Sequence, residues 1–402
     1  MPGETKGVNG RRRGVLPLLF HFRENGGLPL LFILLIFLPL ADMFLHIGRE
    51  VPIWEKRKLA ARPRFEWQKP WDYLRGCENF FSDHFGFRSW LVQRHNLLTV
   101  RCFGASPTDK VVIGRQGWLF MARESEQRNE MDYFRRRRPF TPAELGHWRL
   151  MLRQRRQWLE ERGVVYLFLV VPNKSTVYPE FLPAHIRRPD GQSRLDQLLA
   201  ELGKEKDFPV IDLREKFLAA KGGQRLYSKT DSHWNDLGAY IAFAEIMERL
   251  SARFPDLRRP SPDQYAVRRS GRAGGDLAQM LGLQKRHYRE QAIRLQPNAA
   301  VEVRSVQSRK VIAPYIRVSI SESPAAGLPT LLLVHDSFAH QLKPFLGQRF
   351  RRVVYVWDWG LHFFKDLIER EKPAVVIDEI AERMLCDLKL ENPPELNRPA
   401  AP

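Results

Sequence analysis

Residues 164–171 read VVYLFLVV, a continuous apolar run rich in β-branched and aromatic side chains. A run of this kind predicts a strand that is buried on both faces, as in a parallel sheet. The residues before it carry a helix start, because Thr-Pro-Ala-Glu at 141–144 combines a capping residue, proline at the first helical position and glutamate three residues after the cap. We therefore expect a helix from Thr141 to about Arg162 that leads directly into this strand.

The same alternation continues to residue 377. Further helices are expected at 194–205, 236–250, 338–346 and 361–370, and further strands at 209–213, 330–334, 353–357 and 374–377. Helices and strands in turn predict an α/β domain with a mostly parallel sheet covered on both faces. Residues 263–322 break the rhythm with Gly-rich turns and short alternating segments, so we expect an inserted or edge β-rich region there.

A second apolar run, 28–47, contains only Asp42 and His46 as ionisable residues. As a helix it would be about 30 Å long, the thickness of one hydrocarbon core. A cleaved signal peptide is the competing interpretation, with Arg11 to Arg13 as its basic region. We favour an uncleaved transmembrane anchor, because the apolar run continues past Ala41. Basic residues flank both ends of the run, so the positive-inside rule does not decide its orientation.

These patterns divide the chain into five parts: a basic tail at 1–27, the anchor at 28–47, a Pro- and Arg-rich stalk at 48–78, one large domain at 79–390 and a Pro-rich tail at 391–402. The aromatic-rich segment 79–98 has a helical rhythm and is expected to be a helix that packs on the large domain.

Composition limits the classes of partner. The chain has 65 Lys and Arg against 46 Asp and Glu, a formal net charge of +19, which suggests nucleic acid, anionic lipid or an acidic polysaccharide as partner. The basic regions lack an RNA-binding aromatic pattern and a DNA-reading helix, so we expect no nucleic acid. Three cysteines are too few for a disulfide framework or a zinc site. No phosphate-binding, HExxH or dinucleotide motif occurs, so we expect no cofactor and no metal.

Two segments carry residues suited to nucleophilic catalysis. The sequence LLLVHDSF at 331–338 places Ser337 at a turn between a strand and a helix, where its hydroxyl is exposed and its N–H can face an oxyanion. The sequence TDSHWN at 230–235 places Asp231 two residues before His233, so that the carboxylate can orient the imidazole toward a serine. Each segment alone also fits a helix cap or a surface turn. Together they predict a Ser-His-Asp triad.

Further motifs accompany these two: GRQGWLF at 114–120, VPNK at 171–174, VYPEFLP at 177–183, GGDL at 274–277, and PAVVI at 373–377 with Glu382-Arg383. At these residues the chain resembles the SGNH-hydrolase-like proteins of bacterial exopolysaccharide O-acetylation, the alginate O-acetyltransferase AlgJ/AlgX family. The resemblance covers about Asn79 to Leu385. It implies an SGNH-hydrolase-like three-layer sandwich.

The resemblance also implies roles for individual residues. Ser337 would be the nucleophile, His233 the general base and Asp231 the residue that orients it. The serine would take an acetyl group, form an acyl-enzyme and pass the acetyl to a sugar hydroxyl. The N–H groups of Ser337 and Gly275 are candidate oxyanion donors. His335 stands where the family commonly has glycine, and a positive φ there would strain the histidine.

Candidate substrate-binding residues are Lys174, Trp234 and Asn235. The partners implied are an exopolysaccharide, with an acidic one as an option, the lipid bilayer, and a membrane-bound O-acyltransferase that delivers acetyl groups. The family further implies a single-pass protein of the bacterial inner membrane with its catalytic domain in the periplasm. Two alternatives remain open from the sequence: a carbohydrate acetyl esterase with the same triad, and a non-catalytic scaffold of a polysaccharide secretion complex.

Overall fold

The computed structural model describes residues 27–45 and 59–397, apart from positions 206, 286, 300 and 326. The predicted basic tail at 1–27 therefore lies outside the described residues except for Gly27. The same holds for the first part of the predicted stalk, 48–58, and for the last part of the Pro-rich tail, 398–402. The chain forms two compact units, Met1–His95 and Asn96–Pro402.

In the first unit, helix α2 (Gly27–Leu45) occupies most of the predicted anchor. Within 27–45 and 59–397, no helix has both the length and the apolar character needed to cross a membrane. The aromatic segment predicted as one helix lies in two, α3 (Pro70–His84) and α4 (Arg88–Phe103). The break falls at Phe87, which has a φ of 57° and donates its N–H to Asp42 at 2.8 Å.

The second unit is built on a seven-stranded sheet in the order β4-β3-β11-β9-β10-β8-β7. Its first five strands are parallel: β4 (Val210–Asp212), β3 (Val165–Val171), β11 (Val375–Ala381), β9 (Thr330–His335) and β10 (Arg352–Trp357). These are the five strands predicted from apolar runs. Strand β3 lies between two parallel neighbours and is buried along nearly its whole length, which explains its continuous apolar sequence.

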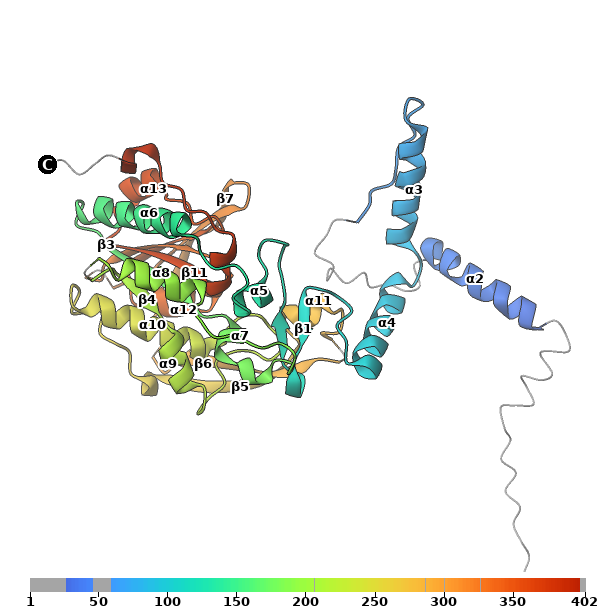
Figure 1. The fold of residues 1–402 in the computed structure, drawn as a ribbon, viewed down its shortest axis with the longest axis horizontal. Coiled ribbons are helices and arrows are strands. Elements are labelled where there is room, and N and C mark those ends of the chain that lie inside the picture. The colour runs from blue at the N-terminus through green and yellow to red at the C-terminus, as the bar shows by residue number, and fades with distance from the viewer. Residues whose placement is uncertain are drawn as a thin grey trace, which may run out of the picture. The chain divides into compact units, whose positions relative to one another are not determined.

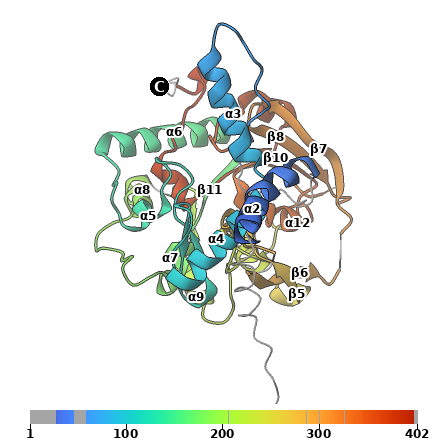
Figure 2. The ribbon, with the colours of Figure 1, turned by 90° about the vertical axis from the view of Figure 1, so that its right-hand side faces the viewer.

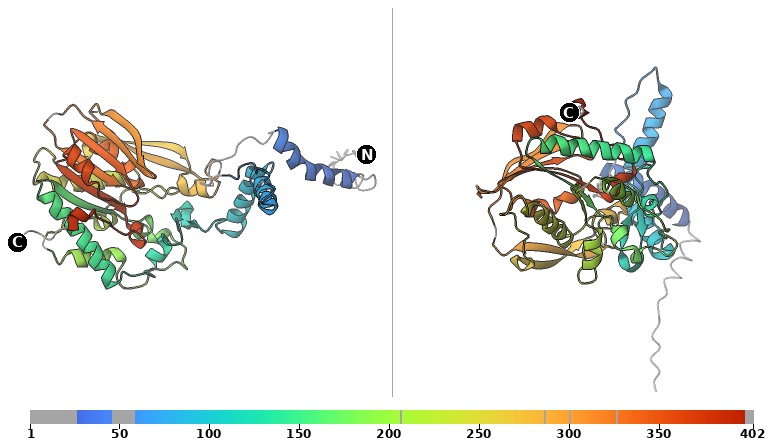
Figure 3. Two further views of the ribbon diagram at one scale, coloured as in Figure 1. Left: turned by 90° about the horizontal axis from the view of Figure 1, so that it is seen from above. Right: turned by 60° about the vertical axis from the view of Figure 1, so that its left-hand side comes forward.

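Helices cover both faces of the sheet, as Figures 1 and 3 show. The predicted capping box opens α6 (Pro142–Glu160), which lies on one face and packs Trp148 against Phe168 of β3. On the other face, the amine of Lys343 in α12 (Lys343–Leu346) lies over the ring of Tyr355 in β10. Helix α10 (Asp236–Ser251) packs against α12 there. The three layers of an α/β sandwich are therefore present.

The largest departures from the predicted helices fall in two segments. Residues 338–346 form a 3₁₀ turn, η5 (Ser337–His340), followed by the single turn of α12. Pro344 explains the break, because it has no N–H to donate to the preceding turn. Residues 361–370 form α13 (Lys365–Glu371), which begins four residues late. Before it, Leu361 has a φ of 48° and the N–H of His362 is bonded to the Asp358 carboxylate, so the chain turns there instead.

The β-rich region at 263–322 is both an insertion and an edge. Strands β5 (Tyr265–Ala273) and β6 (Arg289–Pro297) form a separate two-stranded antiparallel ribbon, visible apart from the main sheet in Figure 2. Strands β7 (Arg304–Ala313) and β8 (Ile316–Glu322) extend the main sheet antiparallel beyond β10. The remaining α-helices and strands of this unit are β1 (Val111–Ile113), β2 (Leu119–Met121), α5 (Glu130–Phe134), α7 (Lys174–Val177), α8 (Arg194–Leu202), α9 (Arg214–Ala220) and α11 (Asp276–Met280).

Candidate active site

The structure brings Ser337, His233 and Asp231 together, although the serine and histidine are 104 residues apart. The Oγ of Ser337 lies 2.8 Å from Nε2 of His233, and Nδ1 of His233 lies 2.8 Å from Oδ1 of Asp231. With Nδ1 protonated against the carboxylate, Nε2 is the free acceptor that faces the serine hydroxyl. The arrangement is that of a nucleophile, a base and an orienting acid.

The nucleophile turn lies at the carboxyl end of the sheet, where α/β folds gather their ligands. Strand β9 ends at His335, and Ser337 begins the 3₁₀ turn η5 two residues later. Asp336 holds this turn in place, because its buried carboxylate accepts from the N–H groups of Phe338 and Ala381, each at 2.8 Å. The second of these bonds ties the turn to the end of β11.

Lys174 is hydrogen-bonded to the loop that carries His233. This lysine was predicted to bind substrate, but its side chain is buried and its amine donates to the carbonyl oxygens of Lys229 and Asp231 at 2.8 and 2.9 Å. The amine also lies over the rings of Trp118 and Phe120. Burial lowers the pKa of Lys174 to about 7, against the attraction of nearby carboxylates. Its observed polar contacts are with the loop, and a role in substrate binding stays a prediction for this residue.

Trp234 and Asn235 were also predicted to bind substrate, and both side chains are buried and hydrogen-bonded within the protein. The indole N–H of Trp234 donates to the carbonyl oxygen of Phe338 at 2.9 Å, and its ring is almost fully buried. Asn235 caps α10 by accepting from the N–H of Leu237 and donates to the carbonyl oxygen of Arg225. Substrate binding by either residue stays a prediction.

The two predicted oxyanion donors differ. Ser337 is the first residue of η5, where a backbone N–H has no partner within the helix. The N–H of Gly275 donates to Oγ1 of Thr230 at 2.9 Å, so the structure does not support it as an oxyanion donor. Gly275 serves a different purpose, because a Cβ at this position would lie 2.4 Å from Oδ2 of Asp231. Only glycine allows the carboxylate to sit this close to the backbone.

The electrostatics favour an ion pair between base and acid. Burial lowers the pKa of His233, but the hydrogen bond that it donates to Asp231 and the charge of Asp276 outweigh burial and raise this pKa. The pKa of Asp231 lies well below its usual value: burial opposes this shift, and the bond and charge of His233 outweigh it. Both side chains keep about a fifth of their surface exposed, 20% for His233 and 19% for Asp231, so the site is open to solvent.

Several residues around the triad were not predicted as part of the site. Arg272 of β5 approaches Oδ2 of Asp231 at 3.5 Å and pairs with Glu290 of β6 at 2.7 Å. Asp276 accepts from both the N–H and the hydroxyl of Ser232, the residue between the acid and the base. Asp276 lies in the GGDL motif, which the sequence offered only as part of the family resemblance. Its contact with Ser232 crosses 44 residues and had no local signal.

His335 fits its position without backbone strain. It is the last residue of β9 and pairs with Trp357 of β10 and Glu379 of β11, so its backbone is extended. The expected penalty for histidine in place of glycine, a positive φ, does not arise. The side chain is fully buried, and burial together with the charge of Lys343 holds the pKa of His335 well below its usual value.

Asp231, His233 and Asp276 are close enough to suit a metal ion, since their ligand atoms lie within 4.8 Å of one another. We do not assign them as metal ligands. Their atoms already bond to each other and to Ser232, and the Nδ1 that faces the two carboxylates carries the bond to Asp231.

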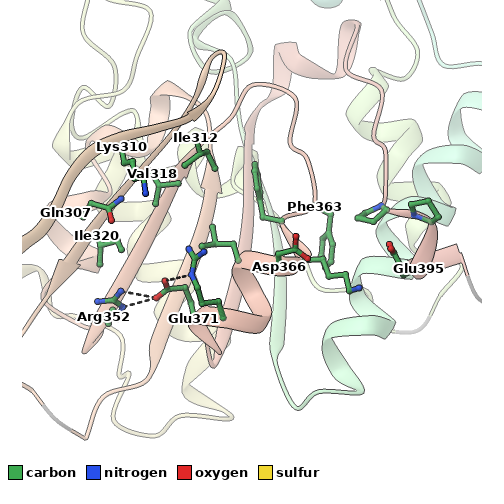
Figure 4. Close-up of a pocket in the computed structure, with 16 residues that line it drawn as sticks. Gln307, Lys310, Ile312, Val318, Ile320, Arg352, Phe363, Asp366, Glu371 and Glu395 are labelled. Atoms are coloured by element: carbon green, nitrogen blue, oxygen red, sulfur yellow. Dashed lines mark hydrogen bonds and ion pairs between the residues drawn. The ribbon is translucent and has the colours of Figure 1, made fainter.

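A hollow of about 810 Å³ lies away from the triad, between β7 and β8 on one side and α13 with the C-terminal segment on the other. Figure 4 shows Lys310 and Ile312 on one wall, Phe363 and Glu395 on the opposite side. Arg352 and Glu371 also line the hollow and form an ion pair, with Nη2 of the arginine 3.0 Å from Oε2 of the glutamate. None of the triad residues lines this hollow.

Comparison with known proteins identifies the class. The family described as SGNH hydrolase-like domain, acetyltransferase AlgX, matches residues 111–382, about two thirds of the chain. The chain therefore belongs to this family of SGNH-hydrolase-like acetyltransferase domains, which confirms the resemblance seen in the motifs.

Among individual relatives, the probable alginate O-acetylase AlgJ of Pseudomonas aeruginosa is 30% identical over 185 residues, 43% of this chain and 41% of that protein. AlgJ of Pseudomonas syringae pv. tomato is 24% identical over 218 residues, 52% of this chain and 51% of that protein. The chain thus spans about half or less of the length of these curated relatives. Among solved structures, the O-acetyltransferase domain of Pseudomonas putida AlgJ is 20% identical, with a TM-score of 0.44 over 70% of this chain and 93% of that one.

Proposed function

We propose that this chain is a polysaccharide O-acetyltransferase that works through an acetylated Ser337. The observation that carries the proposal is the continuous set of contacts from Ser337 Oγ to His233 to Asp231, each at 2.8 Å. Membership of an acetyltransferase family supports the choice of acetyl as the transferred group.

The chemistry follows from the geometry. His233 Nε2 takes the proton from Ser337 Oγ while the oxygen attacks the carbonyl carbon of an acetyl donor. The N–H of Ser337 is the proposed donor to the negative charge that develops on the carbonyl oxygen. When the bond to the leaving group breaks, His233 returns the proton to that group, and an acetyl-serine remains.

The second half reverses these steps with a new nucleophile. A sugar hydroxyl gives its proton to His233 Nε2 and attacks the acetyl-serine. The bond between the acetyl carbon and Ser337 Oγ breaks, and the serine recovers the proton from His233. Asp231 keeps the imidazole in the tautomer that accepts at Nε2 in both halves.

The arginines of the β5–β6 ribbon support an acidic polysaccharide as acceptor. The two strands carry five arginines and a single glutamate: Arg268, Arg269, Arg272, Arg289, Arg294 and Glu290. Arg268 lies directly opposite Arg294, an unfavourable pairing of like charges. Asp236 pairs with Arg294 at 3.1 Å, whereas Arg268 bonds to the neutral Gln296. The ribbon therefore carries a net positive charge, and its Arg272, which pairs with Glu290, also reaches the triad at Asp231.

Other parts of the proposal rest on the family alone. They are a periplasmic location and a membrane-bound O-acyltransferase that supplies acetyl groups. Attachment of this chain to a bilayer stays a prediction from the apolar run at 28–47.

The test offers the full-length chain a chromogenic acetyl ester together with either an oligouronate or a neutral oligosaccharide. Mass spectrometry of the sugars then detects the gain of one acetyl group. We expect acetylated oligouronate with the wild type and none with Ser337→Ala or His233→Ala. Ser323→Ala is the matched control, because that serine is buried away from the triad and bonds to the carbonyl oxygen of Phe350.

Each other outcome identifies an alternative. Release of acetate that depends on Ser337, with no acetylated sugar for any acceptor, would assign the chain as an esterase. Wild-type protein that releases acetate no faster than Ser337→Ala would assign it as a scaffold without catalysis.

A further inference from the structure

Asp276 is bonded to the loop that carries the acid and the base, at the residue between them. Its Oδ1 accepts the N–H of Ser232 at 2.7 Å, and its Oδ2 accepts the Ser232 hydroxyl at 2.6 Å. Asp276 begins helix α11 and follows the turn whose Gly275 packs against Asp231. One short segment from another part of the chain thus holds both sides of the Asp231–His233 loop.

The same carboxylate faces the imidazole. Oδ2 of Asp276 lies 3.7 Å from Nδ1 of His233, on the edge of the ring that Asp231 contacts at 2.8 Å. The Ser232 hydroxyl lies between them, 3.2 Å from Nδ1. The base therefore has two carboxylates on its Nδ1 edge and the nucleophile at its Nε2.

Burial and the neighbouring charge of Asp231 raise the pKa of Asp276. Two close carboxylates repel each other in a partly buried site, and a positive charge between them relieves the repulsion. That positive charge appears when His233 accepts a proton at Nε2. The arrangement is matched to the protonated base, the form that follows proton transfer from Ser337.

We propose that Asp276 is a positioning residue for His233. Asp276 orients the loop through its bonds to Ser232, and its negative charge stabilises the imidazolium of His233. The proposal rests on the proposed function of the triad. The proton that leaves Ser337 Oγ moves to Nε2, the proton on Nδ1 stays in its bond to Asp231, and the new charge lies beside both carboxylates. Asp276 makes no contact with the reacting atoms, so its effect passes through His233 and Ser232.

Other charged groups near the base set the background for this effect. Arg383 opposes the protonation of His233 by its positive charge. The remaining groups act through Asp231 or through its neighbours: Arg272, Lys174 and Glu290. None of these groups is bonded to Ser232. Among the charged groups named here, Asp276 is the one that acts on His233 in two ways: through its bonds to Ser232 and through its own charge.

The experiment measures the pKa of His233 directly, by NMR of the full-length chain with ¹³C-labelled histidine, and assigns the resonance with His233→Gln. Asp276→Asn keeps the size of the side chain and removes its charge. We expect the pKa of His233 to fall in this variant, because a charge that favours the imidazolium is lost. The acid limb of kcat/KM for a chromogenic acetyl ester should move to lower pH, with kcat about tenfold lower.

Ser232→Ala separates the effect of the bond to Ser232 from the effect of the Asp276 charge. It removes the hydroxyl that bonds to Asp276 and leaves the charge in place. We expect a lower kcat with the acid limb where the wild type has it. Thermal unfolding checks that each variant is folded.

An unchanged pKa of His233 in Asp276→Asn would overturn the proposal, whether or not activity falls. The NMR measurement does not depend on acetyl transfer. A wild-type protein without Ser337-dependent activity would contradict the proposed function, whereas the response of the His233 pKa to Asp276→Asn would still decide this inference.

Discussion

The indole N–H of Trp234 donates a hydrogen bond of 2.9 Å to the carbonyl oxygen of Phe338. Trp234 directly follows His233, the proposed base, and Phe338 directly follows Ser337, the proposed nucleophile. The two loops that carry His233 and Ser337 are therefore bonded to each other one residue beyond these side chains, in a buried position where water cannot replace the bond.

Trp234→Phe removes this bond and keeps an aromatic ring in place. We expect the free energy of unfolding to fall by about 1–3 kcal/mol, because the carbonyl of Phe338 is left buried without a donor. Activity should fall as well, since the base is no longer tied to the nucleophile. Urea denaturation and ester hydrolysis measure the two effects. Trp158→Phe on α6 is the control, and it should lose stability without a change in kcat.

Gly275→Ala should disable the site without a change in the backbone conformation. Gly275 has a φ of −78°, which any residue adopts, but the added Cβ would lie 2.4 Å from Asp231. The carboxylate must then move away from His233, and we expect kcat to fall about a hundredfold. Gly271→Ala is the matched control in strand β5, because its Cβ meets no atom within 4 Å. Equal activity of the two variants would contradict this account of Gly275.

Lys174→Met tests whether this lysine orients the loop or contacts the substrate. The methionine keeps much of the length and removes the donor to the carbonyls of Lys229 and Asp231. We expect a lower kcat with little change in KM, because the base loop is displaced. A higher KM with kcat unchanged would support the prediction that Lys174 binds substrate. Lys221→Met is the control, since Lys221 bonds to the carbonyl of Val177 and to Glu180, away from the triad.

The pH dependence follows from the raised pKa of His233. The imidazole accepts the serine proton only when neutral, so the rate must fall as the pH drops through the pKa of the folded protein. Because Asp231 and Asp276 raise this pKa, the acid limb of kcat/KM should lie above the value of an unperturbed histidine, about 6.5. Rates of ester hydrolysis between about pH 5 and about pH 9 locate the limb. A limb below the unperturbed value would contradict the charge arrangement described here.

Much of the fold was predictable because its strongest signals are local. The apolar run of β3 and the capping box of α6 each depend on neighbouring residues, and both appear where predicted. The antiparallel attachment of β7 and β8 was not predictable in the same way. Their alternating sequence indicates half-buried strands, but alternation does not say which strand lies next to them.

The candidate site shows the same difference between local patterns, which were predictable, and contacts between distant segments, which were not. That Ser337 lies near the Asp231–His233 pair was predictable, because each belongs to a short pattern with a chemical meaning. The burial of Trp234 and Lys174 was missed, since the direction of a side chain is decided by packing between distant segments. The contact of Asp276 with Ser232 joins two such segments and is visible only once the chain is folded.

The most direct test of the proposed function looks for the acetylated serine itself. The full-length chain is mixed with a chromogenic acetyl ester, quenched in acid, digested and mapped by peptide mass spectrometry. We predict one added acetyl group on the peptide that contains Ser337. This acetyl group should disappear when an oligouronate acceptor is added before the quench. Two results would contradict the proposed function. One is acetyl transfer to the oligouronate by a protein whose Ser337 peptide is never modified, and the other is acetyl transfer by Ser337→Ala.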